Sequence, residues 1–166
     1  MTWRKERYGF TLIELMMVVV ILIISAVGAI PLMSFGGQIQ VHAAADRLAA
    51  DMNYARNLAI THGLSFGVRF SASQETYQIE DASGNIITHP VNKKAYQIAF
   101  SNDKRFSQVN IVQATFDATT LVRFDYQGSP YNGNGNPLNS GTVTLRADSE
   151  TRLVAVEPIT GVISVQ

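Results

Sequence analysis

The sequence contains no cysteine, which excludes disulfide bridges, thiolate catalysis and cysteine-ligated zinc or iron–sulfur sites. Only three histidines occur, and their spacing does not fit a paired metal ligand: His42, His62 and His89. Charged residues make up only 16% of the 166 residues, and thirteen basic residues balance thirteen acidic ones. A chain this close to neutral lacks the electrostatic footprint of a general nucleic-acid-binding protein. We therefore predict no metal and no cofactor and do not expect a nucleic-acid partner, although a local basic patch stays open as an alternative.

Apolar residues, in contrast, are concentrated in one run. Residues 10–33, FTLIELMMVVVILIISAVGAIPLM, contain a single charge at Glu14, and as a helix they would be about 36 Å long, enough to span a bilayer. Arg4, Lys5 and Arg7 precede the run, whereas residues 32–45 contain no Lys or Arg. The positive-inside rule then predicts a single-pass inner-membrane protein with a cytoplasmic amino terminus and the rest of the chain outside, in the periplasm.

Three interpretations compete for this run: a cleaved secretory signal, a plain membrane anchor and a prepilin-type signal. A secretory signal fits poorly because the run is long and its candidate cleavage site, Ser25-Ala26-Val27-Gly28, lies inside it. A plain anchor does not explain Glu14, because a charged side chain deep in the membrane costs about 2.5 to 3.5 kcal/mol. The third interpretation gives the carboxylate a partner.

Residues 9–15, Gly-Phe-Thr-Leu-Ile-Glu-Leu, resemble the class III signal of type IV pilins and type II secretion pseudopilins. The resemblance implies that residues 1–9 are a leader, which a prepilin peptidase removes by cutting between Gly9 and Phe10. It also implies N-methylation of Phe10 and assembly into a filament through Glu14, which would pair with the new amino group of a neighbouring subunit. Such a buried pair fixes register more than it adds stability.

Pro31 lies within the apolar run, and Gly36 and Gly37 follow it. Because proline removes one backbone donor and clashes with the preceding turn, we expect a helix kink at Pro31 or a short melted stretch within 26–37. A second interpretation, in which Pro31 only marks the membrane exit, stays open. Helical spacing resumes at 38–62, where an apolar stripe predicts an amphipathic helix that packs on the following domain: Ala44, Leu48, Met52, Ala55 and Ala59.

The stretch 48–60, LAADMNYARNLAI, is similar to the helix of GspH/FimT minor pseudopilins, and the closing pattern from Phe124 to Ile163 also resembles that family. Residues 71–120 carry no resemblance that identifies them. From Leu64 onward the apolar pattern alternates, which predicts eight short strands and a hairpin turn at 81–85. The strands are expected at 65–70, 76–80, 96–100, 109–114, 121–126, 142–146, 152–156 and 161–165. The predicted fold is α+β and pilin-like, with the long helix packed on an antiparallel two-layer β-domain at 63–166.

The remaining motifs indicate no enzyme. Residues 128–141 are rich in Gly and Asn but lack the P-loop lysine and the carboxylates that calcium prefers, so we expect a mobile surface loop there. No serine has a defensible His and Asp partner. Two basic pairs, Lys93-Lys94 and Lys104-Arg105, would form a weak, salt-sensitive DNA patch if they converged, although solvated loops explain them more simply.

Together these features predict a structural minor pseudopilin or minor pilin. The expected partners are prepilin peptidase, the inner membrane and other pilin or pseudopilin subunits, with assembly near the tip of a type II secretion pseudopilus or a type IV pilus. Two alternatives stay open: a DNA-binding minor pilin that acts in DNA uptake, and a major pilin-like subunit.

Overall fold

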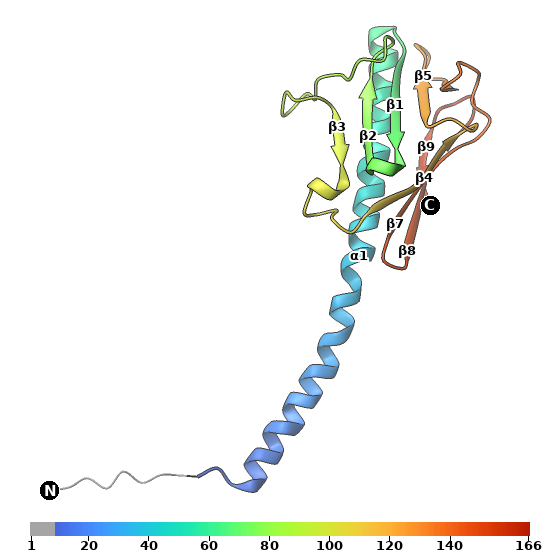
Figure 1. Cartoon of the computed structure of the whole chain (residues 1–166). Coiled ribbons are helices and arrows are strands. Elements are labelled where there is room, and N and C mark those ends of the chain that lie inside the picture. Colours follow the sequence, from blue (N-terminus) through green and yellow to red (C-terminus); the bar gives the residue numbers. More distant parts are fainter. Residues whose placement is uncertain (1–8) are drawn as a thin grey trace, which may run out of the picture. The chain divides into compact units, whose positions relative to one another are not determined.

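The computed structural model describes residues 9–166, and the side chains of residues 9–25 and 36–166 (Figure 1). The leader cations Arg4, Lys5 and Arg7 therefore lie outside the described residues, as does the side chain of Pro31. The chain divides into two compact units, the first ending at Gly36 and the second comprising Gly37–Gln166. Each unit is described by itself.

One helix, α1 (Leu12–His62), contains both segments that the sequence predicted as helical. The expectation of a melted stretch within 26–37 is wrong, because α1 continues through these residues. Proline removes a single backbone donor, so hydrogen bonds on both sides can maintain a helix. A bend at Pro31 stays a prediction.

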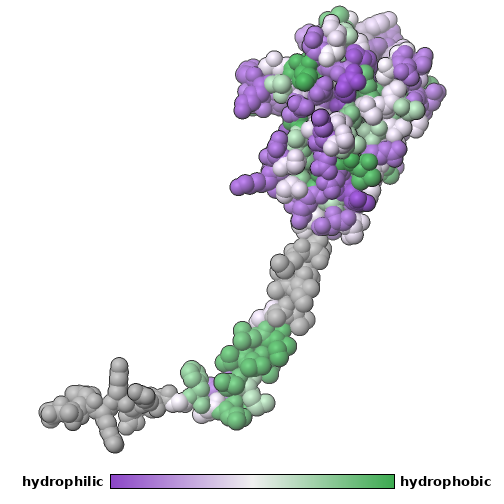
Figure 2. Space-filling view, in the orientation of Figure 1, coloured by the Kyte–Doolittle hydropathy of each residue, from purple (hydrophilic) through white to green (hydrophobic). Residues whose placement is uncertain are grey.

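In the first unit, the large apolar side chains from Phe10 to Ile24 are exposed, with exposed fractions from 46% at Val19 to 83% at Phe10. Figure 2 shows them as a hydrophobic stretch of the helix surface. No helix among the described residues combines the length and the apolar character that a membrane crossing requires.

The second unit contains nine strands in two antiparallel sheets. One sheet has the order β3-β2-β1-β5-β6 and the other the order β4-β7-β8-β9. The strands are β1 (Phe66–Ser71), β2 (Thr76–Glu80), β3 (Gln97–Ala99), β4 (Asn110–Phe116), β5 (Leu121–Phe124), β6 (Pro130–Asn132), β7 (Gly141–Ala147), β8 (Glu150–Val156) and β9 (Ile163–Val165). Two short 3-10 helices, η1 (Ala72–Gln74) and η2 (Phe100–Asn102), follow β1 and β3.

The eight strands that the alternating pattern predicted are all present, with ends shifted by one or two residues at most places. The hairpin turn at 81–85 is also confirmed: Asp81 N donates to Asn85 O at 2.9 Å, and Gly84 adopts the left-handed region with φ 84°. Glycine suits this position because it carries no side chain that would clash there. The predicted antiparallel β-domain is therefore correct in outline.

The core lies between α1 and the two sheets. Every residue of the predicted stripe, Ala44, Leu48, Met52, Ala55 and Ala59, is fully buried. Three of the five are alanines, which add little bulk to this face of the helix. The sheets contribute large side chains to the same core, among them Phe70, Tyr77, Ile79, Phe116, Val122, Phe124, Leu145 and Val154.

The Gly/Asn-rich segment 128–141 is not the mobile surface loop that its composition suggested. It contains β6, which pairs with β5, and it buries Asn132 and Leu138. Asn132 Oδ1 accepts hydrogen bonds from the backbone N–H groups of Asn134 and Asn136 at 3.0 and 3.1 Å. The side chain of Asp117, distant in sequence, accepts from the N–H groups of Asn139 and Ser140, each at 2.9 Å. These side-chain bonds order a segment that has few apolar residues of its own.

Candidate assembly site

The amino-terminal end of α1 is closed by a reciprocal capping arrangement. Glu14 N donates to Thr11 Oγ1 at 3.3 Å, while Glu14 Oε2 accepts from Thr11 N at 3.3 Å and from Thr11 Oγ1 at 3.2 Å. This is a capping box, in which a threonine before the helix and a glutamate three residues later satisfy free backbone donors. Sequence analysis missed it, although the Thr-x-x-Glu spacing was a sufficient signal.

The capping box holds the carboxylate in a defined place. Glu14 lies one turn from the Phe10–Thr11 peptide and is exposed, as is Phe10. The partial positive charge at a helix amino terminus favours an anion here. The carboxylate is therefore positioned beside the chain end that a cut after Gly9 would create.

Gly9 stands in open space. A Cβ atom built on this residue would meet no atom of the other described residues within 4 Å. Packing within residues 9–166 therefore does not require glycine at this position.

The apolar side chains around this end are arranged in shallow grooves. One groove is lined by Phe10, Leu15, Val18 and Val19. Soluble monomers seldom expose continuous apolar surface of this kind. The surface around Glu14 is therefore suited to contact with lipid or with other apolar helices.

The two basic pairs that sequence analysis singled out lie on either side of β3 in the chain. Arg105 is neutralised locally: its Nη2 lies 2.7 Å and its Nε 3.1 Å from oxygens of Asp103. These bonds from Arg105 lower the pKa of Asp103 to about 2. Convergence of Lys93 and Lys94 with Lys104 and Arg105 into a DNA patch stays a prediction, and the Asp103 carboxylate reduces the positive charge that such a patch would have.

Two of the three histidines accept hydrogen bonds from other protein groups. His42 Nε2 accepts a hydrogen bond from Arg152 Nε at 3.0 Å, and His89 Nδ1 accepts from Val91 N at 3.1 Å. His62 is the last residue of α1. Among residues 9–166, no three His, Asp or Glu side chains are grouped so that they could hold a metal ion.

Two polar residues of the stretch 48–60 connect α1 to strand β2 and to the loops of the β-domain. Asp51 accepts hydrogen bonds from the phenols of Tyr77 at 2.6 Å and Tyr96 at 3.1 Å. Arg56 donates to the carbonyl oxygens of Gly128 at 3.1 Å and Thr160 at 2.9 Å. The polar positions of this stretch therefore have a structural role, which sequence analysis did not assign to them.

Comparison with known proteins agrees with this architecture. Residues 44–160 match the family model of type II transport protein GspH, and residues 4–30 match the prokaryotic N-terminal methylation motif. No curated protein matches the chain.

Several solved structures are similar in fold. Two are of the minor pseudopilin EpsH from the type 2 secretion system of Vibrio cholerae, with TM-scores of 0.55 and 0.53 at 13% and 11% identity. The first match covers 76% of this chain and 96% of the EpsH chain, and the second 76% and 92%. The type IV minor pilin FimU of Pseudomonas aeruginosa matches with a TM-score of 0.48 at 15% identity, over 75% of this chain and 91% of that chain.

The fold is thus the α+β pilin-like fold, a long helix packed on antiparallel sheets. Because the GspH model matches more than half of the residues, the chain belongs to the GspH family. It is a minor pseudopilin of this family, structural and not enzymatic. The methylation motif implies processing by prepilin peptidase and an inner-membrane anchor, and the family implies other pilin subunits as partners.

Proposed function

We propose that this chain is cut between Gly9 and Phe10, methylated on Phe10 and assembled near the tip of a secretion pseudopilus or type IV pilus. The observation that carries the proposal is the capping box, which holds the Glu14 carboxylate beside residues 10 and 11. Cleavage makes the Phe10 nitrogen a cationic amine. An anion that is already positioned at the helix end can then bind the amine of a neighbouring subunit.

The orientation that we propose is a cytoplasmic leader and a periplasmic β-domain. It is supported by the cations Arg4, Lys5 and Arg7 before the apolar run and by the lack of Lys and Arg within 32–45. The exposed apolar side chains from Phe10 to Ile24 would contact lipid before assembly and neighbouring helices afterwards. In an apolar surrounding, an amine and a carboxylate each gain most from pairing with the other, so the pair selects one register.

Glu14 has two roles in this account, capping and pairing, and two substitutions separate them. Glu14→Gln retains an acceptor that suits a capping box but removes the charge. Thr11→Ala removes the Oγ1 contacts of the cap, at a cost of about 1 kcal/mol to the first turn, but retains the charge and the backbone N–H that binds Glu14 Oε2. We expect Glu14→Gln to be processed and inserted normally but to fail in assembly, whereas Thr11→Ala assembles.

The measurement is recovery of each variant in sheared filaments, relative to its amount in the inner membrane. Equal recovery of Glu14→Gln and the unaltered chain would show that the carboxylate only caps the helix. If the recovery of Thr11→Ala in filaments falls as much as that of Glu14→Gln, then helix geometry, and not charge, controls assembly.

A further inference from the structure

The longest connection between two strands of the β-domain joins β2 to β3 and comprises residues 81–96. Figure 1 shows it as a loop that extends outward from the sheet. Connections of this length with no helix or strand of their own are uncommon in compact domains, and many of them are functional. This loop therefore merits a search for a binding surface.

Residues 89–94 form an ordered turn at the end of this loop. His89 N donates to Lys94 O at 2.8 Å, and Lys93 N donates to His89 O at 3.1 Å. The centre of the His89 ring lies 4.3 Å from that of Tyr96, which is buried in the core. The turn is therefore held in one conformation and is connected to the core through an aromatic contact.

This turn presents one apolar side chain and two cations to solvent. Val91 is 83% exposed, and Lys93 and Lys94 are exposed as well. Because so little of Val91 is buried, its side chain adds little to the stability of the domain. An apolar centre surrounded by polar groups is the usual composition of a protein-contact surface.

The backbone of Lys93 is strained. Its φ of 58° lies in the left-handed region, which asparagine and glycine adopt more easily than lysine does. Asparagine would thus form the same turn at a lower conformational cost. Strained residues concentrate at functional sites. The strain points to a use of the Lys93 charge outside the fold.

The two lysines have no counter-charge within the part of the chain that the structure describes. None of the ion pairs among residues 9–166 includes Lys93 or Lys94. The surrounding sequence supplies no carboxylate either, since residues 82–102 contain no Asp or Glu. The turn is therefore a small surface with uncompensated positive charge.

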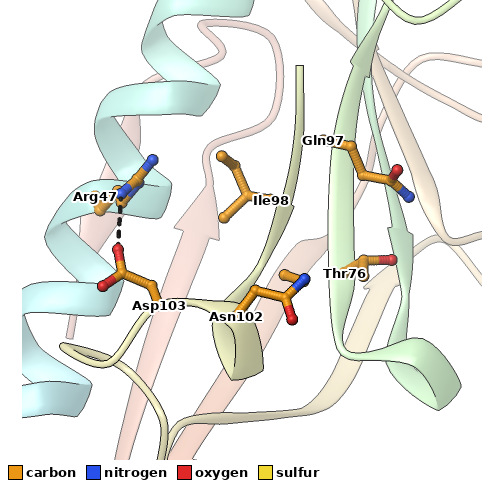
Figure 3. A pocket seen from close by; sticks show the side chains of 7 residues that line it. Arg47, Thr76, Gln97, Ile98, Asn102 and Asp103 are labelled. Carbon is orange, nitrogen blue, oxygen red and sulfur yellow. Dashed lines mark ion pairs between the residues drawn. The ribbon is translucent and has the colours of Figure 1, made fainter. Parts of the chain in front are cut away.

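The other basic pair lies in a different electrostatic setting. Arg105 Nη2 lies 2.7 Å from Asp103 Oδ2, and Arg47 Nη1 lies 3.7 Å from the same oxygen. Figure 3 shows Arg47 and Asp103 facing each other at one wall of a hollow of about 330 Å³. Positive charge is thus partly balanced there. The exposed Lys104 next to Arg105 provides a control lysine outside the 89–94 turn.

We propose that the 89–94 turn binds an acidic surface of another protein, in which carboxylates pair with Lys93 and Lys94 around an apolar depression that accepts Val91. Charge complementarity selects this occupant, because two uncompensated cations attract carboxylates and exclude basic surfaces. An exposed valine adds nothing to contact with a phosphate backbone, and two lysines release few counterions, so a nucleic acid would bind weakly. The inference rests on the proposed function in one respect, because the partner is sought among the proteins of the filament.

The first test is zero-length crosslinking of purified filaments that contain the full chain. A water-soluble carbodiimide activates a carboxylate, the lysine Nζ then attacks the carboxyl carbon, and an amide forms while the reagent leaves as its urea with the carboxyl oxygen. Only groups in contact are joined. We expect mass spectrometry to find Lys93 or Lys94 linked to an Asp or Glu of another protein. Filaments that contain the chain but give no such link would overturn the proposal.

The second test compares Lys93→Asn with Lys104→Gln, each of which removes one exposed lysine. Asparagine suits the left-handed conformation, so Lys93→Asn removes the charge without destabilising the turn. We expect Lys93→Asn to reduce incorporation into filaments by about fivefold and Lys104→Gln to leave it unchanged. Equal incorporation of the two variants would overturn the proposal. If Lys93→Asn does not fold, the crosslinks of the unaltered chain decide.

A third measurement separates a protein partner from a nucleic acid. Full chain in detergent is titrated with duplex DNA, and the same titration is made with Lys93→Asn and Lys104→Gln. We expect no binding at physiological salt. DNA binding that both variants weaken equally would indicate a patch formed by both basic pairs and would overturn the proposal.

Failure of this inference is distinguishable from failure of the proposed function. If the unaltered chain enters filaments and Glu14→Gln does not, but no link from Lys93 or Lys94 is found, only the 89–94 surface is refuted. If the unaltered chain never enters filaments, the proposed function fails and this inference fails with it.

Discussion

Arg123 on β5 reaches across β1 to Glu80 on β2, with 2.7 Å between Arg123 Nη2 and Glu80 Oε1. Gly67 on β1 lies between them, and a Cβ atom at Gly67 would come within 3.0 Å of Arg123 Cγ. Glu80 is only 1% exposed, and Arg69 Nε binds its second oxygen at 2.8 Å. Two guanidinium groups and one buried carboxylate thus connect three adjacent strands, and the glycine makes the crossing possible.

The first prediction concerns this cluster. Arg123→Ala should lower the free energy of unfolding by about 3 kcal/mol, because it removes a partner of a buried charge. Arg69→Ala is the matched control and should cost about 1 kcal/mol, because the Arg69 side chain is 46% exposed and its ion pair is screened by water. Urea unfolding of a fragment that comprises residues 38–166 measures the free energy of unfolding of both variants. If the two variants lose equal free energy of unfolding, then the contact of Arg123 with Glu80 across β1 is no more important than that of Arg69.

The second prediction concerns strain in the turn between β8 and β9. Ile159 has φ 65°, a left-handed conformation that a β-branched side chain disfavours, and it is 83% exposed. Ile159→Asn should raise the free energy of unfolding by about 1 kcal/mol, because asparagine tolerates this conformation and little buried surface is lost. Val162→Asn, in the same turn region and without positive φ, should not stabilise. Thermal melts that shift equally for both variants would contradict the assignment of strain.

The third prediction concerns alkaline pH. Burial first, and then the charge of Asp51, raise the pKa of Tyr77 and of Tyr96 above the ordinary value of 10.0. The unfolded tyrosines lose their protons near pH 10 while the folded ones retain theirs. Stability should therefore be complete below pH 10 and decrease above it, by about 1.4 kcal/mol per pH unit for each tyrosine.

Tyr96→Phe tests this directly, because it removes one titrating phenol and retains the ring. Urea unfolding above pH 10 should show a smaller loss per pH unit for Tyr96→Phe than for the unaltered fragment. The two slopes would coincide if neither phenol stays protonated in the folded state at high pH.

The fourth prediction concerns the boundary of the β-domain. The fragment from Gln38 retains the buried stripe of α1 and should be soluble, monomeric and cooperatively folded. The fragment from Leu64 loses this cover and exposes core side chains such as Phe70, Tyr77 and Phe124, so it should aggregate or fail to fold. Circular dichroism melts compare the two. A fragment from Leu64 that melts as sharply and as high as the one from Gln38 would show that α1 is not part of the core.

Local patterns were sufficient for most of this fold. Alternation identified eight strands because most of them have one face in the core, and the 38–62 stripe identified the buried face of α1 for the same reason. β6 was missed because Pro130–Asn132 is short and lies among Gly and Asn residues. Its order depends on Asp117, which is close in space but not in sequence.

At the candidate assembly site, too, sequence alone was informative only where the feature is local in the sequence. The motif at residues 9–15 is local, so sequence alone predicted the roles of Gly9, Phe10 and Glu14. The Thr11 cap was also readable, since it needs only a three-residue spacing. The Arg123–Glu80 crossing was not, because it depends on which strands are neighbours and in what register.

The central claim is that the processed chain is a filament subunit, and the intact mass of the chain in sheared, purified filaments tests it most directly. The account predicts a species that begins at N-methylated Phe10, present in filaments together with other pilin-like subunits. A chain that still carries residues 1–9, that begins at any other residue, or that is missing from filaments while present in the membrane would contradict the account.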